Sequence, residues 1–178
     1  GYTHDETVNL FLSVANNFLT VFSGEPGCGK TSVCSVIAET MGLVHLEKKL
    51  AETSAWSGDR CDRFLTVPVE RGWTSKRDFL GYFNPLTQSF STNDRRRYDA
   101  FRLLDIEAGT AERPLLPFIF LLDEANLSPM EYYWADFMRI CGGDEQSDKD
   151  IVLADNLVCR IPDHLRFLAT INIDDTTE

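Results

Sequence analysis

The residues with the clearest chemistry lie in one glycine-rich stretch near the N-terminus. The stretch from Gly24 to Thr31 fits the pattern G-x-x-x-x-G-K-[ST]. Glycines allow a tight turn in which successive backbone N–H groups converge on a phosphate at the positive end of a helix. Lys30 is expected to reach the β- and γ-phosphates, and the Thr31 hydroxyl is expected to bind Mg²⁺. The predicted nucleotide-binding residues are Gly24, Glu25, Pro26, Gly27, Cys28, Gly29, Lys30, Thr31 and Ser32.

The segments on either side of this loop have the context that the motif requires. Phe18–Phe22 is a short apolar run rich in strand-forming residues. Residues 31–41 follow the loop with helical periodicity, and Gly42 lies where such a helix would end. The predicted apolar face of this helix is Val33, Val36, Ile37 and Met41. Strand, loop and helix together predict that the chain binds a nucleoside triphosphate.

Two later apolar runs end in polar residues that suit hydrolysis. Phe118–Leu122 does not alternate, which is typical of a strand buried on both faces of a parallel sheet, and Asp123 and Glu124 follow it. Asp123 is expected to hold Mg²⁺ through water, and Glu124 to orient and deprotonate the attacking water. The second run, residues 165–171, ends at Asn172. We expect Asn172 to lie beside Asp123 and to sense the γ-phosphate or the attacking water.

The remaining periodic segments indicate the elements that position these residues. A helix is expected over residues 3–17, with Thr3 and Glu6 spaced as a capping box. A second helix is expected over residues 94–108, where Gly109 ends it. Pro68 indicates that the strand Phe64–Val67 lies at a sheet edge or ends there, and residues 151–153 and 157–161 suggest a hairpin. The first helix is expected to present Val8, Phe11, Leu12 and Ala15 on one face.

Several local patterns carry weaker predictions. Ser128 is expected to cap a helix that Pro129 begins, with Glu131 completing the capping box. Arg95, Arg96 and Arg97 are expected to form a solvated helix start; the alternative is a surface for an acidic neighbour or nucleic acid. The aromatic-rich residues 71–85 fit either core or an exposed contact loop, and their composition favours core. Residues 45–62 lack periodicity and are expected to form a loop or insertion.

Composition limits the function class. A chain of 178 residues fits one domain, and its 43% hydrophobic content is ordinary for a globular protein. The net charge of −11 disfavours a nucleic-acid-binding face, so any DNA contact is expected to come through another domain. The five cysteines form no metal-binding or disulfide pattern and indicate reduced thiols in the cytoplasm. No apolar run approaches the roughly 20 residues of a membrane span, so no membrane partner is expected.

Taken in order, the three motifs resemble the Walker A, Walker B and sensor 1 motifs of AAA+ ATPases. The closer resemblance is to the McrB-like branch, the nucleotide-driven subunit of modification-dependent restriction systems. Residues 73–85, residues 123–128 and the segment from Ile161-Pro162 to residues 172–177 carry this second resemblance. The signature of that branch begins Met-Asn, with an aspartate three residues after the asparagine. Here Ile171 replaces the methionine, while Asn172 and Asp175 keep the pair.

The resemblance implies that residues 1–178 are a partial AAA+ core of α/β class, with three layers and a mostly parallel sheet. A fifth strand, arginine fingers and a helical lid would lie beyond it. It further implies Mg²⁺-dependent hydrolysis, with ATP favoured and GTP an alternative, by a ring that is expected to be a hexamer and to work with a McrC-like nuclease. The implied roles are catalytic for Lys30, Glu124 and Asn172 and metal-binding for Thr31 and Asp123, with Asp175 a further candidate.

Three other functions remain open at this point: a nucleotide-gated scaffold, a chaperone-type remodelling AAA+ protein and a phosphate-loop small-molecule kinase. The adjacent Asp123 and Glu124 count against the kinase, because a water-activating glutamate is typical of hydrolysis.

Overall fold

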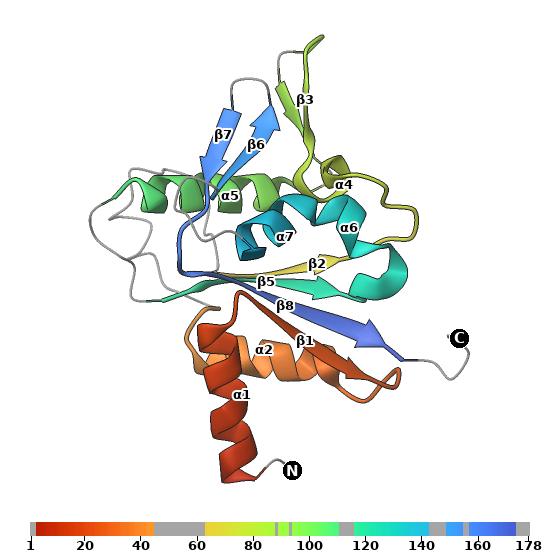
Figure 1. Ribbon diagram of the computed structural model, residues 1–178, viewed down its shortest axis with the longest axis vertical. Helices are drawn as coiled ribbons and strands as arrows, with labels where there is room; N and C mark the ends of the chain where they lie inside the picture. The colour runs from red at the N-terminus through yellow and green to blue at the C-terminus, as the bar shows by residue number, and fades with distance from the viewer. Residues whose placement is uncertain are drawn as a thin grey trace.

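Four parallel strands form the central sheet of the protein. The structure is a computed structural model that describes residues 3–44, 63–87, 89–92, 94–110, 116–142, 149–154 and 157–173. The strand order is β1-β8-β5-β2. In Figure 1 all four arrows run in the same direction. The strands are β1 (Leu19–Gly24), β2 (Phe64–Pro68), β5 (Phe118–Asp123) and β8 (Leu165–Asn172).

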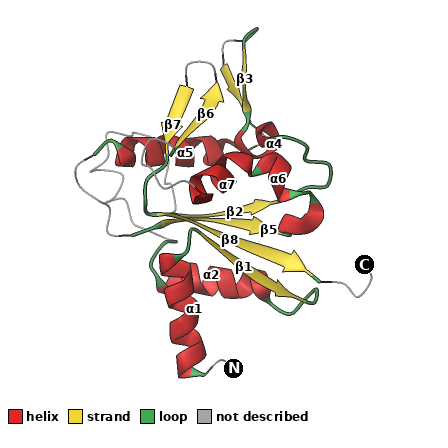
Figure 2. Cartoon of the chain, viewed as in Figure 1, coloured by secondary structure: helices red, strands yellow, loops and turns green. Residues whose placement is uncertain are grey.

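Helices cover both faces of this sheet, as Figure 2 shows. One face carries α1 (His4–Asn16) and α2 (Lys30–Thr40). The other carries α4 (Lys76–Leu80), α5 (Arg95–Ala108), α6 (Met130–Tyr133) and α7 (Ala135–Gly142), with the short turn η1 (Ala125–Leu127). Two antiparallel hairpins extend beyond α5: β3 (Tyr82–Asn84) with β4 (Ser89–Ser91), and β6 (Asp150–Ala154) with β7 (Leu157–Arg160). The expected three-layer α/β class with a parallel sheet is confirmed.

Strand β5 explains how the two faces are held together. Its residues from Phe118 to Leu122 are all fully buried. Because successive side chains point to opposite faces, Phe118, Phe120 and Leu122 enter the core under α5 and α7. Ile119 and Leu121 enter the core under α1 and α2. The apolar run without alternation is therefore a strand buried on both faces, as predicted.

The capping box of α1 is confirmed, but its predicted apolar face is only partly right, because Phe11 packs against the core whereas other members of the face do not. The Thr3 hydroxyl accepts a hydrogen bond from the Glu6 N–H, and the Glu6 carboxylate accepts one from the Thr3 N–H. However, Val8 is 42% exposed and Leu12 is 53% exposed, whereas Val14 is buried. The helix meets the core through Phe11 and Val14, so Leu12, on another side of the helix, and Val8, nearer its N-terminus, remain in solvent.

Helix α2 shows a similar departure from its predicted face. Ile37 is buried, and Val33 and Met41 pack against the same core, but Val36 is 58% exposed. The strand before the phosphate loop, expected over Phe18–Phe22, is β1 and extends to Gly24.

Ser128 does not cap the following helix, so that prediction is wrong. Its hydroxyl donates to the Glu70 carbonyl at 2.8 Å and accepts from the Trp73 N–H at 3.0 Å. The helix starts at Met130 with Pro129 in the cap position, and it is interrupted at Trp134 before α7. The Ser128 hydroxyl therefore hydrogen-bonds backbone groups far away in the sequence, and not the N–H groups of the helix that follows it.

Arg97 is also placed differently from the prediction. Arg95 and Arg96 are solvated as expected, but Arg97 is only 6% exposed. Its guanidinium donates to the carbonyls of Asp78 and Phe79, where α4 ends. This buried charge therefore joins α5 to α4, which a pattern of three consecutive arginines does not reveal.

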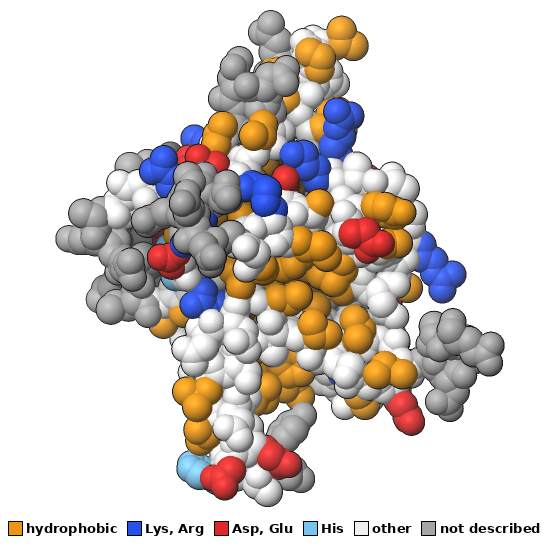
Figure 3. Space-filling view, in the orientation of Figure 1, with side chains coloured by type: hydrophobic (Ala, Val, Ile, Leu, Met, Phe, Trp, Pro, Cys, Tyr) orange, Lys and Arg blue, Asp and Glu red, His pale blue; other side chains and the backbone are white. Residues whose placement is uncertain are grey.

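The aromatic-rich residues 71–85 divide between the two alternatives. Trp73, Phe79 and Leu80 are buried in the core, as favoured, whereas Tyr82 and Phe83 are more than 40% exposed on β3. Figure 3 shows apolar side chains on the end of the molecule that β3 forms. The predicted loop over residues 45–62 lies outside the described residues. Within the described residues, no helix is long and apolar enough to cross a membrane.

Near the N-terminal ends of β2 and β8, an ionic cluster joins three segments: the residue before β2, the end of α5 and the residue before β8. Both Glu107 carboxylate oxygens accept hydrogen bonds from Arg63, at 2.6 and 3.1 Å. The ring of His164 lies 2.7 Å from the same carboxylate. Burial raises the pKa of Glu107, but the hydrogen bonds from His164 and Arg63 and their charges outweigh it, so the pKa lies below its ordinary 4.5.

We expect Glu107→Gln to lower the unfolding free energy by about 3 kcal/mol at neutral pH, because it leaves a buried Arg63 without its carboxylate. Urea denaturation measures this. The folded-state pKa is depressed, so the stabilisation by Glu107 is present above the ordinary pKa and is lost as pH falls through the folded-state value.

As pH falls, the unfolding free energy of the Glu107→Gln variant should therefore not show the decrease that protonation of Glu107 causes in the wild type. The exposed Glu39, changed to Gln, is the matched control. Equal stability of the two variants at neutral pH would contradict the role of the cluster.

Candidate functional site

The predicted site residues lie where the parallel strands end. Gly24 at the end of β1 is in register with Asn172 at the end of β8. Pro68 at the end of β2 is in register with Asp123 at the end of β5. The loops that leave these strands therefore meet at one edge of the sheet, the usual ligand-binding edge in open α/β folds.

The loop after β1 has the backbone that phosphate binding requires. Gly27 and Gly29 have φ values of +79° and +89°, in a region that L-residues with side chains rarely adopt. Gly29 is the N-cap residue of α2, and no side chain caps the N–H groups of that helix. These donors, at the positive end of the helix dipole, suit an anionic ligand.

Lys30 lies over this loop. Its Nζ donates to the carbonyl of Gly24 at 2.9 Å and to that of Glu25 at 2.7 Å. Both acceptors belong to the predicted phosphate loop, so the ammonium group lies at the loop that is expected to hold a phosphate.

Asp123 links the loop helix to the sheet. Its Oδ1 accepts hydrogen bonds from the Thr31 hydroxyl at 2.8 Å and from the Thr170 hydroxyl at 2.7 Å. A hydroxyl beside a carboxylate provides the hard oxygen ligands that Mg²⁺ prefers, so these residues fit the expected metal. Mg²⁺ held by Thr31 and Asp123 would neutralise charge on the phosphate oxygens of a nucleotide.

Glu124 has an unusual backbone. Among the described residues it is the one non-glycine residue with positive φ, at φ 55° and ψ 48°. Its N–H donates to the Thr170 hydroxyl at 2.9 Å, and its Oε1 accepts from the Asn172 side-chain amide at 3.0 Å. A left-handed conformation costs about 1–2 kcal/mol for such a residue, so these contacts hold a conformation that the chain alone disfavours.

The structure therefore brings together Thr31, Asp123, Glu124 and Asn172, with Lys30 over the adjoining loop. Their catalytic and metal-binding roles remain predictions. Asp175 lies outside the described residues.

Sequence reasoning missed two residues that belong to this network. The first is Thr170, which is 1% exposed and hydrogen-bonds Asp123 and Glu124 at once. The second is Asn126, which hydrogen-bonds the backbone of Asn172. A signal for Thr170 was present, because a hydroxyl within an otherwise apolar strand needs a buried partner.

Cys34 on α2 lies behind the site. Burial, with the nearby negative charge of Asp123, raises the pKa of its thiol to about 12. The group therefore stays protonated at neutral pH, and its role is packing in the core that it shares with Ile37 and Ala38.

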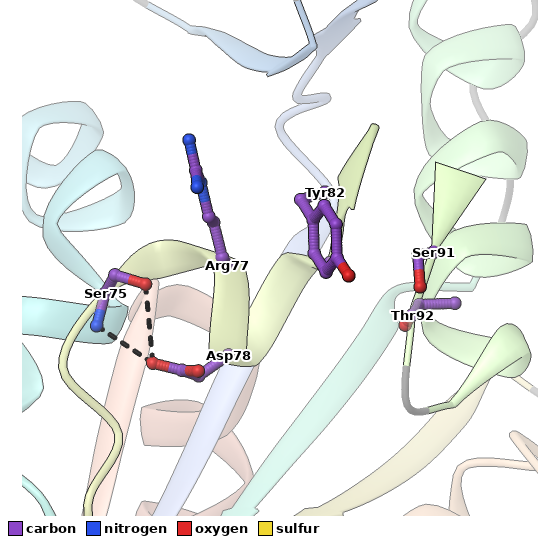
Figure 4. A pocket seen from close by; sticks show the side chains of 7 residues that line it. Ser75, Arg77, Asp78, Tyr82, Ser91 and Thr92 are labelled. Carbon is purple, nitrogen blue, oxygen red and sulfur yellow. Dashed lines mark hydrogen bonds between the residues drawn. The ribbon is translucent and has the colours of Figure 1, made fainter. Parts of the chain in front are cut away.

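A separate hollow of about 250 Å³ lies beside α4 at the base of the β3–β4 hairpin. Figure 4 shows Arg77, Tyr82 and Thr92 around it, while Asp78 hydrogen-bonds Ser75 at the start of α4. None of its lining residues belongs to the predicted nucleotide site.

Residues 20–68 match the family model described as "ATPase family associated with various cellular activities (AAA)". That segment contains the phosphate loop, α2 and β2, and the match supports a relationship to AAA ATPases. A solved structure from Cytophaga hutchinsonii, whose description proposes an ATPase, is similar with a TM-score of 0.49 and 16% identity. The similarity covers 94% of this chain and 38% of that one, so this chain spans well under half its length. Among curated proteins, none matches the chain significantly.

We predict that Thr170→Val destabilises the protein by about 1–3 kcal/mol, because it removes the hydroxyl partner of the Glu124 N–H and the Asp123 carboxylate. Thermal and urea unfolding measure this. The same variant should weaken the Mg²⁺-dependent part of nucleotide binding in a calorimetric titration. Thr170→Ser keeps the hydroxyl and should restore both properties; equal losses in the two variants would show that the hydroxyl is not responsible.

Proposed function

We propose that this chain is the nucleotide-binding core of an AAA+ ATPase that hydrolyses a nucleoside triphosphate with Mg²⁺. One observation carries the proposal: a continuous hydrogen-bonded network runs from Thr31 through Asp123 and Thr170 to Glu124 and Asn172. This network joins the residues that we propose as metal ligands, base and sensor to Thr31, the last residue of the glycine-rich motif. The matched family model over residues 20–68 supports it.

Each residue has a role that suits its position. Lys30 grips the phosphates, and Thr31 and Asp123 hold the metal. Glu124 accepts the proton of the attacking water, a contribution of about 10²–10⁴ in rate for a general base. Asn172 orients that water or the γ-phosphate, because its amide already lies beside the Glu124 carboxylate.

We further propose that the parent protein is a McrB-like ring motor, with ATP as the preferred nucleotide. The support is the order of the three motifs and the retained Asn172 in the signature. The ring, a McrC-like nuclease subunit and DNA contact through another domain extend the same proposal. An arginine supplied by a neighbouring subunit would raise turnover by about 10³ or more, as in other phosphate-loop enzymes.

A small-molecule kinase is the less favoured reading, because Glu124 is exposed at the site and lies next to the proposed metal ligand. A scaffold that binds nucleotide without turnover is also disfavoured by an intact Glu124. A remodelling AAA+ protein of the chaperone type would share the same site chemistry and differ in what the ring acts on.

We expect Glu124→Gln to retain nucleotide affinity within about threefold and to lower phosphate release by about 10² or more, because only the proton acceptor is lost. Lys30→Ala should abolish binding. Calorimetric titration with non-hydrolysable ATP and GTP analogues in Mg²⁺ measures affinity, and release of inorganic phosphate measures turnover.

The exposed Glu39→Gln variant is the control for the loss of a carboxylate. Equal turnover in wild type and Glu124→Gln would reject the assigned base. Phosphate found on an acceptor molecule instead of free in solution would favour the kinase.

A further inference from the structure

The end of β8 is held by a side chain from the turn that follows Glu124. The Asn126 amide donates from Nδ2 to the Asn172 carbonyl at 3.0 Å. Its Oδ1 accepts from the Asn172 N–H at 3.3 Å. Both contacts fall on one residue, so they restrain the rotation of that backbone as well as its position.

This contact lies where β8 no longer has β5 as a hydrogen-bonding partner. Strand β5 pairs with β8 only as far as Leu122 and Ala169, three residues before Asn172. On the other side, β1 still pairs with Asn172 through Gly24. Beyond Asp123 the chain turns into η1, and the primary amide of Asn126 carries the same donor and acceptor as a peptide group. It therefore continues the β5 side of the ladder at Asn172.

The contact is connected to the proposed base. The side chain of Asn172 donates to Glu124 Oε1 at 3.0 Å, and Glu124 is two residues before Asn126. The backbone from Glu124 to Asn126 and the hydrogen bonds that both residues make to Asn172 thus close a ring around the turn. A shift of the Asn172 backbone would move the amide that holds the carboxylate.

We propose that Asn126 is a positioning residue: it holds the backbone of Asn172 so that the Asn172 amide orients the Glu124 carboxylate. This inference rests on the proposed hydrolytic function. Asn126 is exposed, so it fills no core space, and its two hydrogen bonds act on a single residue of the site. Its effect reaches the reaction through Asn172.

The test compares wild type, Asn126→Ala, Asn172→Ala and the double variant in steady-state phosphate release with Mg²⁺-ATP. Asn126→Ala should lower kcat between about tenfold and about 100-fold, the cost of a misplaced catalytic group. Affinity for a non-hydrolysable analogue should stay within about twofold, because the phosphate loop is untouched. The double variant should be no slower than Asn172→Ala, since Asn126 acts through that side chain.

Asn9→Ala, an exposed asparagine on α1, is the matched control and should keep wild-type kcat. In the nucleotide-free protein, Asn126→Ala should speed hydrogen exchange at the Asn172 amide, a readout that does not depend on turnover. Wild-type kcat in Asn126→Ala, or a full additional loss in the Asn172→Ala background, would overturn the inference. A wild type that binds nucleotide without turnover would instead reject the proposed function, and unchanged exchange at Asn172 would show that Asn126 does not hold it.

Discussion

The Asp123 carboxylate is the centre on which the rest of the site depends. One of its oxygens accepts hydroxyl donors from Thr31 at the start of α2 and from Thr170 in β8. Hydrogen bonds to an ionised acceptor are about twice as strong as those between neutral groups. Without this charge, the helix that follows the phosphate loop and the strand that carries Asn172 would lose their common partner.

The position of Asp123 is in turn set by burial of β5. Each fully buried apolar side chain of Phe118–Leu122 contributes about 1.5–3 kcal/mol, and a hydrogen bond to a charged group contributes a similar amount. The five buried side chains of this run together outweigh the two hydroxyl contacts of Asp123. A slip of one residue would exchange the two cores that the strand supplies. Hydrophobic packing therefore decides where the carboxylate lies, and the hydroxyl contacts refine its orientation.

The left-handed backbone of Glu124 separates two neighbouring carboxylates. The Asp123 carboxylate accepts hydrogen bonds from hydroxyls of α2 and β8, whereas the Glu124 carboxylate, beyond the end of β5, accepts one from the Asn172 amide. Thr170 stabilises both orientations, because its hydroxyl donates to Asp123 and accepts from the Glu124 N–H. Adjacent acidic residues thereby acquire different surroundings, which suits their proposed roles as metal ligand and base.

The sequence by itself determined the phosphate loop, the doubly buried β5 and the polar residue that ends β8, because glycine conformations and apolar runs are local properties. It also indicated most of the elements that form the three layers, although not α4. Only the tertiary structure decided the burial of Arg97, the use of the Ser128 hydroxyl and the roles in the network of Thr170 and Asn126. Each of these polar groups has partners far away in the sequence, and their local patterns fit other partners equally well. Which partner a polar group takes depends on the segment that packing brings beside it.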